Sequence, residues 1–205
     1  MNDEITGEDA LRAAYPRASD AVYQKELRFL DPHCRSFIAL SPFLCIGTSR
    51  PDGLADVSPR GGEPGFVHVL DDRHLGMPDR PGNNRLDTLG NVVVAPAVGL
   101  LFFIPGIDEM LRVNGVAQVV TTPALMARFV VDGKQPRSVL VVEVREAYLH
   151  CTKALKRSEL WNPEKLVPRS ALPSFGQMLK DQMNLPVPAE AIDTMLEEDA
   201  RTELY

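Results

Sequence analysis

The sequence has few cysteines, one tryptophan and no long hydrophobic run. Its three cysteines, Cys34, Cys45 and Cys151, are an odd and widely spaced set. This pattern excludes a disulfide framework and a CxxC pair, so we expect reduced, partly buried thiols. The most apolar run, 98–104, is far shorter than the roughly 18 residues of a membrane-spanning helix and is predicted to be a buried strand. The first residues are acidic and lack the apolar stretch of a secretory signal, so we expect a cytoplasmic protein.

Positive charge and the common catalytic motifs are also scarce. The chain carries 22 Lys and Arg against 28 Asp and Glu, a formal net charge of −6, which disfavours binding to nucleic acid or to anionic membranes. It contains no G-x-G-x-x-G, no G-x-x-x-x-G-K-[ST] and no G-x-S-x-G, so Rossmann, P-loop and serine-hydrolase signatures are all missing. Its four histidines lack zinc-ligand spacing. His68 and His74 could face each other across a hairpin, but with no third ligand nearby we expect no metal site.

Apolar residues make up 44% of the 205 residues. A single domain of this length removes roughly 70% of its unfolded surface from water, so a sizeable core is available. Helices are predicted at both ends of the chain, two of them within 19–40. The order Asp31-Pro32 is typical of a helix start, because Asp accepts a free N–H and Pro has none to leave unsatisfied. Shorter helices are predicted over 83–91 and after Thr122, and two more over 174–183 and 188–201.

Between the helical ends, short apolar segments alternate with turn residues. Strands this closely spaced favour an antiparallel barrel with peripheral helices over a doubly wound parallel sheet. We expect an N-terminal helical segment (1–40), a barrel domain (41–150) and a C-terminal helical extension (151–205) that packs on the barrel. The predicted strands are 43–48, 54–57, 66–70, 74–77, 92–104 (broken at Pro96), 110–120 and 139–149.

Two motifs indicate an anion site. Ser58, Arg60 and three glycines fall within eight residues, and glycines let backbone N–H groups approach an anion while Arg offers a bidentate fork. Further on, Asn84 and Arg85 stand at the expected start of a helix, whose free N–H groups also favour an anion. Either motif alone is more typical of a turn or a helix cap than of an anion site. Because both flank the hairpin 66–77, they could converge on one phosphate.

Three segments in this order carry a resemblance: Ser58-Pro59-Arg60-Gly61-Gly62, then Met77 to Arg85 (MPDRPGNNR), then Leu111 to Ala117 (LRVNGVA). From about residue 20 the chain resembles the flavin-binding split-barrel family, which is related to pyridoxamine 5′-phosphate oxidase. The tail over 150–161 and 175–182 is similar to a poorly characterised bacterial subgroup. The order of the motifs is fairly specific for the fold and much less specific for the reaction.

The resemblance implies a six-stranded antiparallel split β-barrel that forms a homodimer, with one FMN in each of two clefts at the interface. The C-terminal extension would then pack on the barrel or on the dimer. The cofactor-binding residues that it implies are Ser58 and Arg60 (ring and phosphate), Met77 and Pro78 (beside the isoalloxazine), Asn84 and Arg85 (phosphate), Arg112 (from the partner subunit), and Lys153, Arg157 and Trp161 (closing over the cleft).

The departures from the oxidase limit what can be carried over. Asn84 stands where the oxidase has the first residue of an Arg-Lys pair, so one positive charge is absent, and Lys153 or Arg157 could replace it. The oxidase's C-terminal substrate-binding motif is not recognisable, so we do not carry over pyridoxamine phosphate as the substrate. No residue stands out as a general acid or base, and the catalytic residue is left unassigned.

The resulting hypothesis is an FMN-dependent oxidoreductase that acts on a small molecule. Its electrons would come from NADH, from NADPH or from the substrate itself, and the flavin would carry the redox chemistry. Three alternatives stay open. One is a flavin reservoir or redox sensor without turnover, and another is a deazaflavin or haem in the same cleft, because one fold can host several functions. The third is a scaffold protein that binds no cofactor.

Overall fold

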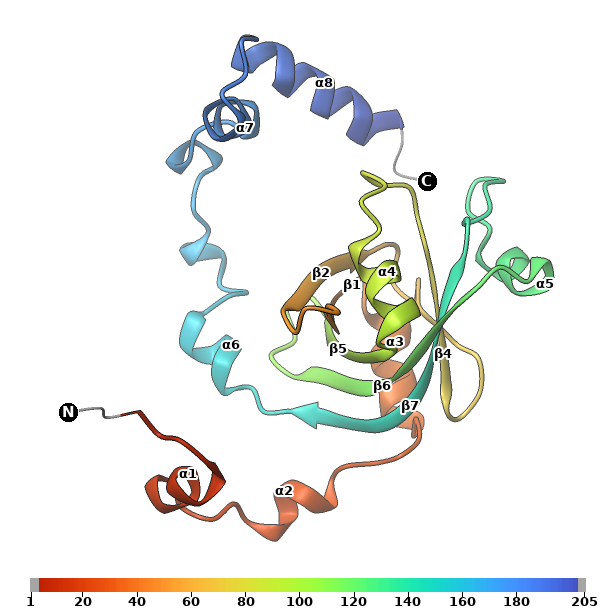
Figure 1. Ribbon diagram of the computed structural model, residues 1–205, viewed down its shortest axis with the longest axis vertical. Helices are drawn as coiled ribbons and strands as arrows, with labels where there is room; N and C mark the ends of the chain where they lie inside the picture. Colours follow the sequence, from red (N-terminus) through yellow and green to blue (C-terminus); the bar gives the residue numbers. More distant parts are fainter. Residues whose placement is uncertain (1–3, 203–205) are drawn as a thin grey trace.

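A single antiparallel sheet organises the chain, with the strand order β2-β1-β5-β6-β7-β4-β3. The computed structural model describes residues 4–202, and Figure 1 shows the sheet curving around a core with α3 and α4 beside it. The family resemblance implied six strands, whereas this sheet has seven, one of them the two-residue β3. The strands are β1 (Phe43–Ser49), β2 (Ala55–Gly61), β3 (His68–Val69), β4 (His74–Pro78), β5 (Ala97–Phe103), β6 (Met110–Val120) and β7 (Val139–His150).

The core lies on the concave side of the sheet. Along β1 and β5, alternate residues are buried, as expected for strands with one covered face. Leu44 and Ile46 of β1 and Phe102 of β5 are completely buried. The apolar face of α3 (Pro32–Leu40) closes the core with Phe37 and Ile38. The expectation of a mainly antiparallel β fold with peripheral helices is therefore confirmed.

Helix α3 begins where the sequence predicted, and α4 does not. The Asp31 carboxylate accepts the Cys34 N–H at 2.8 Å, which caps α3. Helix α4 (Asp87–Val94) was expected over 83–91. It starts later because Leu86 adopts a left-handed conformation (φ 60°) just before it. It also continues through Val94, so the prediction of a strand from residue 92 was wrong and β5 begins only after Pro96.

An irregularity in the β6–β7 pairing keeps the core continuous. Asn114 pairs with Glu146 but Gly115 pairs with Val144, so Arg145 is an extra residue on β7. This bulge switches which residues of β7 face inward, and Val144 and Ala147 are both completely buried. Gly115 is required here, because a Cβ at this position would lie 2.2 Å from the Glu143 carbonyl oxygen.

Figure 1 shows the two ends of the chain lying outside the sheet. Leu27 joins the N-terminal segment to β7 through a bridge with Ala147, and the Trp161 Nε1–H donates to the Ile107 carbonyl at 2.9 Å. Among residues 4–202, no helix is both long and apolar enough to cross a membrane. The division at residues 40 and 150 stays a prediction. The remaining helices are α1 (Glu8–Ala14), which was not predicted, α2 (Asp20–Gln24), α5 (Pro123–Met126), α6 (Lys153–Ser158), α7 (Phe175–Met183) and α8 (Ala189–Thr202).

Candidate functional site

A cavity of about 460 Å³ lies between β2 and the segment that joins β4 to α4. This volume is within the range of small-molecule and cofactor sites. Half of the predicted site residues line it: Ser58 and Arg60 from β2, Pro78 at the end of β4, and Asn84 and Arg85 ahead of α4. The two anion motifs that flank the 66–77 hairpin in the sequence therefore meet at one cavity.

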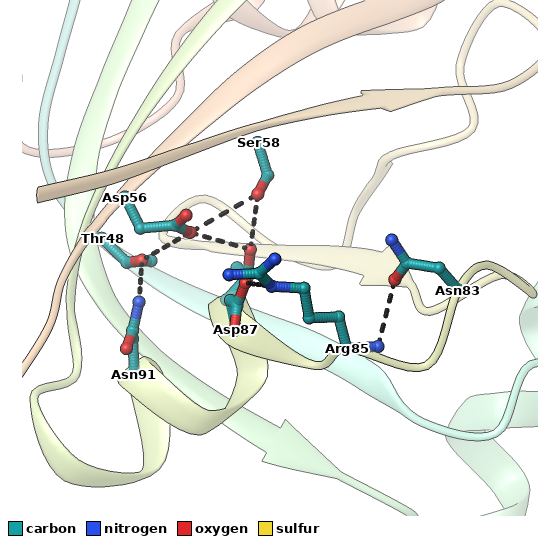
Figure 2. A network of polar contacts seen from close by, with 8 residues as sticks. Thr48, Asp56, Ser58, Asn83, Arg85, Asp87 and Asn91 are labelled. Atoms are coloured by element: carbon teal, nitrogen blue, oxygen red, sulfur yellow. Dashed lines mark hydrogen bonds and ion pairs between the residues drawn. The ribbon is translucent and has the colours of Figure 1, made fainter. Parts of the chain in front are cut away.

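A network of polar side chains fixes the floor of this cavity (Figure 2). The Asp56 carboxylate accepts long hydrogen bonds from the hydroxyls of Thr48, Ser58 and Thr88, at 3.4 to 3.5 Å. The single proton of the Thr88 hydroxyl is shared between Asp56 and the closer Ser58 Oγ, 3.1 Å away, and the Asn91 amide donates to Thr48 Oγ1 at 2.9 Å. Because Thr48, Thr88 and Asn91 are buried, the network holds the Ser58 hydroxyl in one place at the cavity wall.

The arginines at the cavity are already partly engaged. Arg85 Nε donates to Asp87 at 2.5 Å, and the side chains of the pair are 74% and 45% exposed, so the ion pair contributes little to stability and leaves the guanidinium accessible. Arg60 donates through Nη1 to the carbonyl of Pro59 at 2.8 Å. Arg137, which no sequence motif had indicated, donates through Nη1 to Asn84 Oδ1 at 3.2 Å.

Asp79 lines this cavity, and the pKa of its carboxyl departs clearly from its ordinary value. Burial raises the pKa of its carboxyl, and the positive charges of Arg60 and Arg137 oppose that rise without cancelling it. The carboxyl can therefore hold a proton more readily than a solvated aspartate. Nothing in the sequence distinguished Asp79 from the exposed acidic residues, because its burial follows from the fold.

The other predicted site residues lie outside this cavity within one chain. Met77 is buried in the core, only 3% exposed. Arg112 lies on the outer face of the sheet and donates to the Tyr148 hydroxyl at 2.9 Å. Lys153 and Arg157 belong to α6, and Trp161 follows it. Their expected contact with a cofactor would need a second copy of the chain and stays a prediction.

Positive charge also gathers around Tyr148 on the outer face. The Lys25 ammonium lies 5.3 Å from the centre of the Tyr148 ring and donates to the Leu149 carbonyl, while Arg112 approaches the same ring at 5.6 Å. Nearby, His150 Nε2 is buried without a hydrogen-bond partner among the described residues. Burial, Arg112 and Lys25 lower the pKa of His150, so the imidazole is neutral at pH 7. His150 Nε2 is therefore a buried polar atom, close to two cations, that no described residue satisfies.

The histidines of the second hairpin do not form a pair. His68 stacks on Phe129 with ring centres 4.1 Å apart, and His74 Nδ1 lies 2.9 Å from the carboxylate of Asp71. Over residues 4–202 no group of three potential metal ligands occurs.

Comparison of the sequence with known protein families gives one match that covers most of the sheet and this cavity. The family model described as pyridoxamine 5′-phosphate oxidase matches residues 30–151, more than half of the chain. No curated protein matches the sequence. Solved structures with a similar fold include HupZ of Group A Streptococcus, 14% identical, with a TM-score of 0.48 over 58% of this chain and 92% of that one. General stress protein 26 of Bacillus anthracis is 15% identical, with a TM-score of 0.42 over 57% and 93%. The conserved hypothetical protein Rv2991 of Mycobacterium tuberculosis is 16% identical, with a TM-score of 0.46 over 69% and 94%.

Proposed function

The chain belongs to the pyridoxamine 5′-phosphate oxidase family, and on that premise we propose that it binds FMN in the cavity between β2 and α4 and acts as an oxidoreductase on a small molecule. One observation carries the proposal. Arg60 and Arg85 come from separate motifs, and both line a single cavity of suitable size together with Ser58. Guanidinium groups are the donors that a phosphate ester requires, so the two arginines fit the cofactor.

Arg137 supports this fit. The sequence lacks one positive charge at Asn84, and Lys153 and Arg157 were named as residues that could replace it. Arg137 lies at this position within the same chain, with its guanidinium hydrogen-bonded to the Asn84 side chain. We therefore assign the phosphate to Arg60, Arg85 and Arg137, with Asn84 orienting the third guanidinium.

When bound, FMN supplies the electron-transfer chemistry, and the protein orients it and tunes its surroundings. Ser58 offers a hydroxyl whose direction is fixed by Thr88 and Asp56. Asp79 holds a proton at its carboxyl more readily than a solvated aspartate, which makes it the residue of this cavity best suited to give or accept a proton during turnover.

We further propose that the protein is a homodimer in which Arg112, Lys153, Arg157 and Trp161 complete the partner's cleft. The outer face of the sheet leaves apolar side chains in water, with Phe43 40% and Val57 69% exposed. Paired copies related by a twofold axis would cover such a face. The orphan nitrogen of His150 beside Arg112 also favours completion by a second copy.

The phosphate assignment is tested by comparing FMN with riboflavin, which lacks the phosphate. Arg85→Ala and Arg137→Ala should each weaken FMN binding about ten- to a hundredfold, because a hydrogen bond to a charged group contributes roughly 1.5–3 kcal/mol. Riboflavin binding should change little. Arg50→Ala is the matched control, since Arg50 pairs with Asp52 in the turn between β1 and β2. Equal losses for both ligands would mean that these arginines only support the fold.

Turnover is tested separately by anaerobic reduction of the loaded protein with NADH or NADPH. Bleaching of the flavin absorbance followed by reoxidation on adding an acceptor is expected of an oxidoreductase. A flavin that binds tightly but is reduced by neither donor, nor by any small-molecule substrate, would favour a reservoir or sensor. A protein that does not bind added FMN at all would contradict the proposal.

A further inference from the structure

One acidic side chain stands among the arginines of the cavity between β2 and α4. Asp79 directly follows β4 and lines the cavity together with Arg60 and Arg85. Its backbone N–H donates to the Ser138 carbonyl oxygen at 2.9 Å, which holds Asp79 beside the segment that carries Arg137. A carboxylate in this place would repel the phosphate that we assign to these arginines. Its presence in an anion site therefore needs a physical reason.

The arginines near Asp79 are engaged with other groups, whereas its own carboxyl is not. Arg85 pairs with Asp87, as Figure 2 shows, and Arg60 donates to the Pro59 carbonyl. Among the described residues, no hydrogen bond or ion pair joins the carboxyl of Asp79 to another side chain. This carboxyl is only half-buried at the cavity wall, so it is exposed to whatever the cavity binds.

Two opposing effects set the charge of this carboxyl in the free protein. Arg60 on β2 and Arg137 just before β7 favour the ionised form, and burial opposes them more strongly, so the pKa of Asp79 is raised. The adjacent Arg80 also lines the cavity, with its guanidinium held by the Phe129 carbonyl at 2.8 Å. The carboxyl is thus balanced between its charged and neutral forms by groups that face the cavity.

A bound phosphate would change this balance in one direction only. A phosphate monoester carries a charge of about −1.5 to −2 at pH 7 and would replace the carboxylate as the counter-ion of Arg60 and Arg137. Added negative charge near Asp79 disfavours its ionised form, and water that leaves the cavity has the same effect. The affinity of the carboxyl for a proton must therefore rise when the ligand binds.

We propose that Asp79 takes up a proton from solvent when a phosphate ester binds in this cavity. The carboxylate is the counter-ion of the arginines in the free protein, and the neutral acid is the form present beside the bound ligand. The inference rests on the proposed function for the identity of the ester, which is FMN. It also explains how Asp79 acquires its proton before turnover begins.

Calorimetric titration with FMN in two buffers of different ionisation enthalpy counts the protons taken up. At pH 6 the wild type should take up at least about half a proton more per FMN than Asp79→Asn. This comparison cancels the proton that the FMN phosphate itself exchanges near its pKa of about 6. Asp79→Glu keeps a titratable carboxyl and should retain most of the uptake. Asp52→Asn, an acid in the turn between β1 and β2, is the control and should match the wild type.

The dissociation constants test the same linkage. At pH 8 the wild-type carboxylate opposes the phosphate, and the amide of Asp79→Asn does not. The variant should therefore bind FMN about tenfold more tightly at pH 8, because a like charge nearby changes the pKa of a carboxyl by about one or more. This advantage should shrink as the pH falls and the wild-type carboxyl becomes protonated. Riboflavin, which brings no charge, should bind equally well to both proteins.

Inorganic phosphate, titrated in the same way, separates this inference from the proposed function. Extra proton uptake with phosphate, but no binding of FMN, would support the inference and contradict the proposed function. Equal proton uptake by the wild type and Asp79→Asn on binding FMN, with equal affinities at pH 8, would overturn the inference and leave the proposed function standing. A protein that binds neither FMN nor phosphate would overturn both.

Discussion

Gly115 gives the sharpest test of how the β6–β7 bulge holds the barrel together. In Gly115→Ala the added Cβ would lie 2.2 Å from the Glu143 carbonyl oxygen and 2.9 Å from Val142 Cγ1. A carbon normally approaches a carbonyl oxygen to about 3.3 Å, so the two strands must separate locally by roughly 1 Å. The obstacle is backbone in the longest strand pair of the sheet, and no side-chain rotation can relieve it.

The size of the effect follows from that displacement. Overpacking a well-filled site costs about 1–3 kcal/mol, and each ladder hydrogen bond that is stretched or broken adds about 1 kcal/mol. We therefore expect a loss of about 3 kcal/mol in the free energy of unfolding. For a chain of this size the urea m-value is near the upper end of roughly 1–3 kcal/mol/M, so the urea midpoint should fall by about 1 M.

Gly90→Ala is the matched control for this measurement. Gly90 is inside α4 and a Cβ there would contact nothing within 4 Å. Alanine should stabilise the helix by about 0.5–1 kcal/mol, because glycine loses more conformational entropy on folding. Opposite shifts of the two urea midpoints are expected. If Gly115→Ala unfolded within about 0.5 kcal/mol of the wild type, the bulge would not be the tight contact described here.

Three further predictions concern titratable groups. Burial and the neighbouring Asp31 carboxylate raise the pKa of Cys34 to about 12, so a thiol reagent at pH 8 should label exposed Cys151 quickly and Cys34 only after unfolding. The raised pKa of Asp79 means that its charge opposes folding, so Asp79→Asn should raise the melting temperature at pH 7. That gain should vanish as the pH falls below the ordinary value of 3.8, where both states are protonated. Asp31→Ala should cost about 1 kcal/mol at pH 7 through loss of the α3 cap. Because the Cys34 N–H lowers the pKa of Asp31, this cost should shrink as the wild-type carboxyl is protonated in acid, which unfolding curves at several pH values would show.

Local patterns in the sequence predict much of the barrel. The Asp31-Pro32 start of α3 and the alternating burial of β1 and β5 depend on neighbours within a few residues, so they can be inferred without the fold. The start of α4 could not be predicted in this way. Leu86 takes a left-handed conformation that its own side chain disfavours, and only the surrounding chain imposes it.

The bulge in β7 also could not be predicted from the sequence. Strict alternation along 139–149 assigns Val144 and Ala147 to opposite faces, yet both are completely buried. The extra residue Arg145 resolves this conflict, and it is tolerated because Gly115 across the strand pair leaves room for the Glu143 carbonyl. The evidence for the bulge is therefore divided between Gly115 on β6 and Arg145 on β7, and the sequence of either strand alone does not predict it.

The positive charge at the cavity likewise could not be predicted from one sequence motif, because the fold brings distant residues together. Compared with the Arg-Lys pair of the oxidase motif, Asn84 replaces a positively charged residue. From the sequence, Lys153 or Arg157 could have supplied the missing charge. Arg137 lies beside Asn84 although 53 residues separate them in the chain, because β7 runs alongside β4 and brings the residues just before it to the segment that follows β4. A phosphate responds to the positive charge that surrounds it in space, whichever residues supply it. In the proposed phosphate site, Arg137 thus supplies from a distant part of the sequence the positive charge that the motif lacks at Asn84.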